Sequence, residues 1–114
     1  MTRIERAVVR VRVLGDVDIG TVDRIRAQIA DCTSAKAGHV VLDLRGATFL
    51  DATGFDLVLE ADAASRADGW EFGLVGGPAH LQRIFDLTGC RARFPFLTAA
   101  QLAAKLTEAG EATG

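Results

Sequence analysis

Apolar and polar residues follow two different periods along the chain, and the period changes several times. Alternation with a period of two, and short continuous apolar runs, are typical of strands. These patterns predict strands at residues 7–14, 40–44, 70–75 and 93–96. Apolar residues three and four positions apart are typical of amphipathic helices. They predict helices at residues 21–35, 53–67, 78–88 and 98–108.

The order of these elements predicts the fold class. Strands alternate with helices at spacings suited to right-handed crossovers, so we expect a single α/β domain with a mostly parallel sheet. The pattern does not give the order of the strands in that sheet. Residues 1–6 are expected to be a polar lead with a short or missing first strand, 7–108 the folded domain, and 109–114 a frayed tail.

The junction between the central strand and the following helix is the most specific stretch. Arg45-Gly46 is expected to close the strand, and either Asp51 or Thr53 to cap the helix that follows. Gly69 supplies a left-handed residue at the end of that helix. An exposed helix N-terminus of this kind presents backbone N–H groups and is a natural place for an anion.

Composition and charge narrow the class of protein. With 114 residues, 49% of them hydrophobic and 25% charged, the chain has the composition of one soluble globular domain. A net charge of −2 argues against binding of nucleic acid, so we interpret the arginines between Arg3 and Arg12 as a solvated strand face. No apolar stretch is long enough to span a membrane and no signal peptide is recognisable, so we expect a cytoplasmic protein without membrane contact.

The two cysteines, Cys32 and Cys90, lie far apart in sequence and show no metal-ligand spacing. We expect two reduced thiols, with a regulatory disulfide as the less favoured alternative.

Catalytic chemistry would have to come from aspartates that fall near the expected strand ends, namely Asp16, Asp18, Asp43, Asp51 and Asp56. Such acids hold magnesium in phosphoryl-transfer receivers, but no lysine follows a later strand here, and turns and helix caps explain the same residues. Neither cysteine has a histidine in a catalytic motif, and no phosphate-binding loop is present. We therefore expect no enzyme activity, no metal and no cofactor.

Three blocks of sequence carry a resemblance to a known family. The blocks are G-D-V-D at 15–18, D-L-R-G-A-T-F-L-D-A-T-G-F at 43–55 and L-Q-R-I-F-D-L-T-G at 81–89. In order and spacing they resemble the STAS domain of bacterial anti-sigma factor antagonists, over roughly residues 7–106. The resemblance implies a sheet of four to five strands in a βα superhelix with about four helices, the strands neighbouring one another in chain order.

The resemblance also implies a function. In the family, the 15–18 loop and the start of the second helix dock on an anti-sigma factor, typically a serine kinase, and docking releases a sigma factor. A phosphate placed by the kinase on a serine in this face ends docking. The positions expected to contact the partner are Asp16, Asp18, Asp51, Ala52, Thr53, Gly54 and Asp56.

This chain departs from the family pattern at two of these positions. Ala52 stands where the phosphate-accepting serine is usual, so we expect no phosphorylation there. Thr53 is a possible substitute, although a role in helix capping or packing is favoured. Asp56 stands where glycine is common. The chain is thus a permanently active antagonist, a member that binds something other than a kinase, or a degenerate member.

Two rival interpretations remain open. One is a STAS subunit of another assembly, such as a stress-sensing or lipid-transport complex. The other is a protein that binds a small molecule or nucleotide in a pocket near Asp18 and Asp51.

Overall fold

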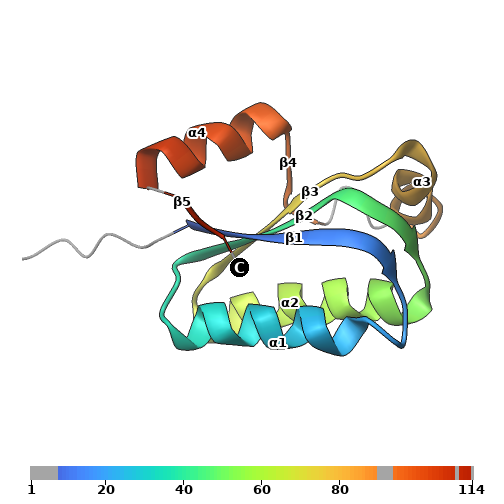
Figure 1. The fold of residues 1–114 in the computed structure, drawn as a ribbon, viewed down its shortest axis with the longest axis horizontal. Helices are drawn as coiled ribbons and strands as arrows, with labels where there is room; N and C mark the ends of the chain where they lie inside the picture. The colour runs from blue at the N-terminus through green and yellow to red at the C-terminus, as the bar shows by residue number, and fades with distance from the viewer. Residues whose placement is uncertain (1–7, 90–93, 110, 114) are drawn as a thin grey trace, which may run out of the picture.

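Figure 1 shows the computed structural model, which describes residues 8–89, 94–109 and 111–113. Its elements are, in chain order, β1 (Val8–Val17), α1 (Val22–Ser34), β2 (His39–Leu50), α2 (Ala52–Asp68), β3 (Glu71–Val75), α3 (Ala79–Leu87), β4 (Phe96–Leu97), α4 (Ala99–Ala109) and β5 (Glu111–Thr113). The predicted alternation of strands and helices is confirmed.

The strands form one five-stranded sheet in the order β4-β3-β2-β1-β5, and every neighbouring pair is parallel. From β1 to β4 the strands neighbour one another in chain order, as the resemblance implies. Helices α1 and α2 cover one face of the sheet, α4 covers part of the other face, and α3 lies at the end where β1 and β2 terminate (Figure 1). The carboxyl ends of the strands and the start of α2 therefore meet at one end of the domain.

The main core lies between the sheet and helices α1 and α2. The predicted apolar stripe of α1 is buried in full, and it comprises Val22, Ile25, Ile29 and Cys32. Phe85 of α3 is completely buried and contacts three other phenylalanine rings at centroid distances of 5.2–5.7 Å. These offset and edge-on ring contacts attach α3 to the same core.

A second, smaller core holds α4 on the opposite face. It is formed by Val8, Val41, Val75, Leu102 and Leu106. Val8 shares a strand face with Arg10 and Arg12, which the sequence indicated to be solvated, but α4 covers that face at Val8 and buries it. A capping box begins this helix: the N–H of Thr98 donates to Oε1 of Gln101 at 2.8 Å, and the N–H of Gln101 donates to the Thr98 hydroxyl at 3.0 Å.

The expected end of the central strand at Arg45-Gly46 is wrong. Strand β2 continues to Leu50 because its second half pairs with the equally extended end of β1, where Leu14 faces Gly46 and Val17 faces Leu50. A Cβ atom on Gly46 would lie 3.0 Å from the carbonyl oxygen of Val13. The glycine is thus a point of close strand approach and does not form a turn.

The C-terminal segment also differs from expectation. Residues 111–113 are not a frayed tail: they form β5, which pairs with β1 from Val8 to Arg10. The last predicted strand is displaced to Phe96–Leu97, and it lies at the edge of the sheet. Pro78 is the N-cap of α3, one position before the first helical residue. The expected lead at residues 1–6 lies outside the described residues.

Helix α1 ends in a Schellman motif with a lysine at the left-handed position. The N–H of Ala37 donates to the carbonyl of Cys32, the N–H of Lys36 donates to that of Thr33, and Lys36 has φ of +63°. A residue with a Cβ atom is strained at such a φ. We expect Lys36→Gly to raise the free energy of unfolding by roughly 0.5–1 kcal/mol. Chemical denaturation measures this, with Lys36→Ala as the control that keeps the strain; equal stability of the two variants would contradict the assignment.

The buried His39 makes stability depend on pH. Burial lowers the pKa of its imidazole, Lys105 of α4 lowers it further, and Glu71, whose carboxylate lies 3.3 Å from Nδ1, opposes the shift. The unfolded chain takes up this proton near pH 6.5 whereas the folded chain resists it. Stability is therefore expected to fall as the pH drops below about 6.5. Melting curves between pH 7.5 and 5 should show a smaller fall for His39→Gln; identical slopes would exclude His39 as the cause.

Candidate functional site

The face at the carboxyl ends of β1 and β2 brings the predicted contact residues together. The N–H of Asp51, at the junction of β2 and α2, donates to the carbonyl of Val17 at 3.2 Å. This bond places the first turn of α2 beside residues 15–18, as the resemblance implies, although residues 15–17 belong to β1 and do not form a loop. We call the surface formed by residues 14–19 and 49–56 the strand-end face.

Gly54 allows the first turn of α2 to lie directly against β1. A Cβ atom at this position would stand 2.9 Å from the carbonyl oxygen of Val17, 2.8 Å from its Cγ1 and 2.6 Å from Cδ1 of Leu50. Gly54 is itself buried. Its place in the sequence block is thus explained by packing, because a glycine here lets the first turn of α2 lie against β1.

Asp51 caps α2, which resolves the choice between Asp51 and Thr53. Its Oδ1 accepts from the N–H of Gly54 at 3.0 Å, and its carbonyl accepts from the N–H of Phe55. The Thr53 side chain is half-buried and does not cap the helix. A carboxylate already satisfies part of this helix N-terminus, which weakens its attraction for a second anion.

Asp16, near the end of β1, and Asp18, just after it, are both used in local structure. Oδ1 of Asp18 accepts from the N–H of Gly20 at 2.9 Å and from the Thr21 hydroxyl at 3.3 Å, which closes the turn into α1. Oδ1 of Asp16 accepts from the Thr48 hydroxyl at 2.7 Å, a side-chain bond between the paired ends of β1 and β2. Both carboxylates thus have a structural role, and both add negative charge to the strand-end face.

Ala52 and Asp56 are exposed on the outer side of the first turns of α2. The side chain of Ala52 offers no hydroxyl group, and Asp56 adds a further carboxylate beside it. The strand-end face therefore carries the side chains of Asp16, Asp18, Asp51 and Asp56. Such a surface favours a partner with basic residues.

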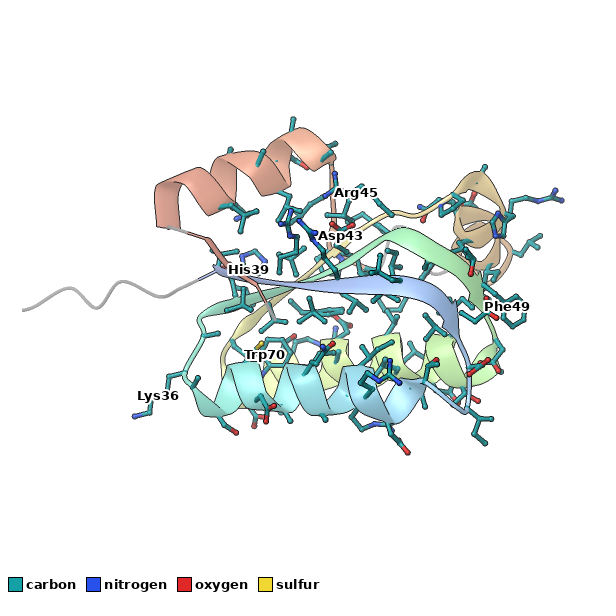
Figure 2. The ribbon with its side chains drawn as sticks, in the orientation of Figure 1. Lys36, His39, Asp43, Arg45, Phe49 and Trp70 are labelled. Atoms are coloured by element: carbon teal, nitrogen blue, oxygen red, sulfur yellow. The ribbon has the colours of Figure 1, made fainter. Side chains whose placement is uncertain are left out.

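Exposed apolar side chains lie on the same face, and the sequence did not predict them as site residues. Ile19 is 80% exposed, Leu14 77% and Phe49 50%. Figure 2 shows Phe49 at the end of the sheet, on the side opposite Lys36. Adjacent strand residues point to opposite faces, so with Leu50 buried, Phe49 must point outward. Apolar side chains ringed by charge are typical of an interface for another protein.

Asp43 and Arg45 form a separate ion pair on the sheet face that α4 partly covers (Figure 2). Burial would raise the pKa of the Asp43 carboxyl, but hydrogen bonds from the Arg45 guanidinium at 2.9 and 2.7 Å outweigh it, so the pKa lies below its ordinary value. The ion pair with Arg45 therefore gives Asp43 a structural role. Among the described residues, no group of three His, Cys, Asp or Glu side chains is placed to hold a metal ion.

Three cavities among the described residues lie away from the strand-end face. The first lies at the ends of α1 and α2, the second lies in the groove between those helices, and the third lies beside His39. Neither Asp18 nor Asp51 lines any of the three. The Cys32 thiol is buried, and this burial raises its pKa. Cys90 lies outside the described residues, so its relation to Cys32 stays a prediction.

A family model described as "Mlab, STAS domain" matches residues 1–99 of the chain. The chain belongs to the STAS family. The three sequence blocks and the chain-order sheet of this STAS domain agree with that assignment. None of the helices in the described part of the chain is both long and apolar enough to cross a bilayer.

Solved structures with the same fold include proteins of two kinds. The unphosphorylated anti-sigma factor antagonist SpoIIAA matches at 21% identity with a TM-score of 0.74, covering 96% of this chain and 94% of its own. An anti-sigma factor antagonist from Mycobacterium paratuberculosis matches at 23% identity with a TM-score of 0.65, covering 87% and 83%. The STAS domain of a SulP transporter from Vibrio cholerae matches at 16% identity with a TM-score of 0.67, covering 93% and 86%. At these identities the matches establish the fold.

Proposed function

We propose that this STAS domain is a protein-binding module that acts as an anti-sigma factor antagonist. The observation that carries the proposal is the strand-end face, where exposed Phe49 and Ile19 lie among aspartates beside a helix N-terminus. Apolar anchors inside a charged rim suit a protein partner better than a small molecule. The similarity to SpoIIAA supports an anti-sigma factor as that partner.

The module works by binding, without catalysis, in the cytoplasm. Its partner is an anti-sigma factor of the serine-kinase type, and occupation of that protein frees a sigma factor. With alanine at position 52, the kinase has no hydroxyl to phosphorylate at the usual site, so docking is not ended there. The contact residues are those predicted from the resemblance, with Leu14, Ile19 and Phe49 added as apolar anchors.

A displacement experiment tests this function. Purified domain is added to a preformed complex of the candidate anti-sigma factor and a fluorescently labelled sigma factor, and release is followed by anisotropy. Release by the wild type but not by Phe49→Asp is the expected result, with Lys36→Asp, at the other end of the sheet, as a matched control for adding a carboxylate. If a saturating concentration of the domain releases no sigma factor, the anti-sigma factor is not the partner.

A second candidate function has its own support. The matching family is described by the name Mlab, and SulP transporter STAS domains share the fold. This favours a subunit of a transport assembly that uses the same strand-end face for a different protein. Binding of the wild type, but not of Phe49→Asp, to a purified transporter subunit would support this candidate over the first.

A further inference from the structure

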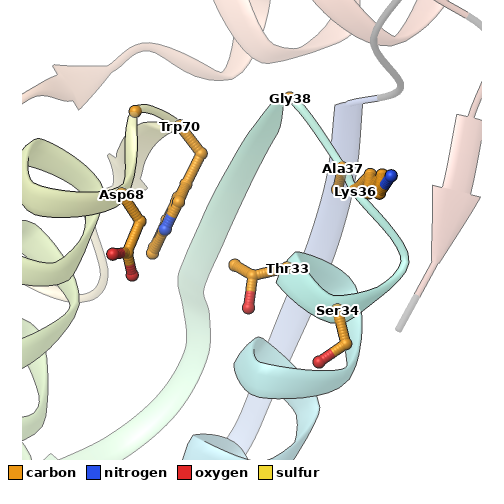
Figure 3. A pocket seen from close by; sticks show the side chains of 8 residues that line it. Thr33, Ser34, Lys36, Ala37, Gly38, Asp68 and Trp70 are labelled. Atoms are coloured by element: carbon orange, nitrogen blue, oxygen red, sulfur yellow. The ribbon is translucent and has the colours of Figure 1, made fainter.

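A cavity at the opposite end of the domain from the strand-end face has the features of a cation site. It has a volume of about 500 Å³ and lies where α1 and α2 both end. Figure 3 shows the Trp70 indole along one side, the Asp68 carboxylate next to it, and Thr33 across the gap. The remaining lining residues are Ser34, Lys36, Ala37, Gly38 and Gly69.

The charge around this cavity is negative. Two helix C-termini each contribute about half a negative charge from their carbonyl groups. The last turn of α1 has no basic residue, and Arg66 in the last turn of α2 is bound to Asp62 at 2.7 Å. Asp68 adds a full carboxylate. Lys36 is the cation among the lining residues, and its side chain extends away from Trp70 and Asp68 (Figures 2 and 3).

The Trp70 side chain determines which kind of cation fits the cavity. The indole of Trp70 is half-buried, and an edge-on contact with Phe72 at a centroid distance of 6.1 Å fixes its orientation. The face of tryptophan attracts large, weakly hydrated cations. A bare metal ion would instead need several oxygen ligands, and the described residues hold no group of three His, Cys, Asp or Glu side chains placed to bind one.

A second cavity adjoins the first and shares Thr33, Asp68 and Trp70 with it. Its volume is about 200 Å³, and it follows the groove between α1 and α2, where Ile29, Leu57 and Ala61 provide apolar surface. This groove offers space for an alkyl substituent of the cation.

We propose that the cavity between Trp70, Asp68 and the ends of α1 and α2 binds an alkylammonium cation, with the charged head against the indole and the alkyl group in the adjoining groove. The ammonium head belongs either to a free molecule or to the choline headgroup of a lipid. The site lies at the far end of the sheet from the strand-end face and does not depend on the proposed function.

The chain has one tryptophan and no tyrosine, so Trp70 reports on its own site by fluorescence. We would titrate the whole chain with butyltrimethylammonium chloride against sodium chloride at equal ionic strength. A saturable change in emission is expected with the organic cation alone. Asp68→Asn should weaken binding by about tenfold, because it removes the carboxylate beside the head. Asp86→Asn, in α3 at the other end of the sheet, is the matched control and should bind as the wild type does.

A second experiment controls for loss of the Trp70 fluorescence and for loss of the fold. Ligand-observed NMR should show that Trp70→Leu, if it melts as the wild type does, no longer binds the cation. Vesicles of phosphatidylcholine identify the source: a response to vesicles as well as free cation assigns the headgroup, and a response to free cation alone assigns a soluble ligand. No saturable response of the wild type, or equal affinity of Asp68→Asn, would overturn the proposal.

Discussion

Replacing Ala52 by aspartate is expected to weaken binding of the protein partner by at least a hundredfold while leaving the fold intact. In the isolated domain, an acid in the first turn of a helix gains roughly 0.3–1 kcal/mol from the helix dipole. Asp56 lies four residues further along the helix and offsets part of this gain, since like charges at that spacing repel. The melting temperature should therefore change little.

In the complex with the partner, the same carboxylate is expected to be unfavourable. The strand-end face already carries four aspartates for the basic residues expected of the partner to pair with, and the exposed Ala52 is neutral, so no partner cation is expected opposite it. A desolvated and unpaired carboxylate costs several kcal/mol, which corresponds to the hundredfold loss or more. Calorimetry with the purified partner measures the affinity, and Ala52→Ser, which adds a hydroxyl without charge, should bind as the wild type does. Undiminished binding by Ala52→Asp would place the interface elsewhere on the molecule.

Replacing Gly54 by alanine is expected to destabilise the fold by about 2–3 kcal/mol. The new methyl group would come within 2.9 Å of the carbonyl oxygen of Val17, and backbone at that distance has to move. Overpacking of a well-filled site costs typically 1–3 kcal/mol, and the contact with a main-chain atom places this variant at the upper end. A loss of this size lowers the melting temperature of a domain this small by roughly 10–20 °C.

Thr53→Ala is the matched control for the glycine variant. It changes the neighbouring residue of the same helical turn and adds no atom, so the melting temperature should stay within a few degrees of the wild type. Urea denaturation gives the free energies for all three proteins. If Gly54→Ala unfolds at the same urea concentration as the wild type, α2 is free to shift away from β1 and the close contact is not what positions the strand-end face.

The sequence predicted best where a periodic pattern extends over several turns or residues. The stripe of Val22, Ile25 and Ile29 identified α1 and its buried face, since only a helix brings those residues together. The end of β2 was missed for the opposite reason. Arg45-Gly46 has the local composition of a turn, and only pairing with the end of β1 keeps the chain extended as far as Leu50.

The same distinction holds for the candidate site. The sequence blocks predicted that Asp18, Asp51 and Ala52 lie on one face. The roles of the two carboxylates depend on contacts that the sequence pattern does not reveal. Asp51 is the cap because its Oδ1 reaches the N–H of Gly54, and Asp18 closes a turn. Ile19 and Phe49 were missed as contact residues because an apolar residue in a loop or at a strand end gives no sign in sequence of whether it is buried.

The small core beneath α4 is separate from the main core, so the two parts of the domain are expected to differ in stability. Leu102 and Leu106 pack on the outer side of the sheet, whereas the strand-end face is built on the main core between the sheet and helices α1 and α2. Among the described residues, the core beneath α4 is much smaller than the main core, so we expect opening of α4 to cost less free energy than global unfolding. Substitutions in the last helix are then expected to alter the lifetime of the protein before they alter its affinity for a partner.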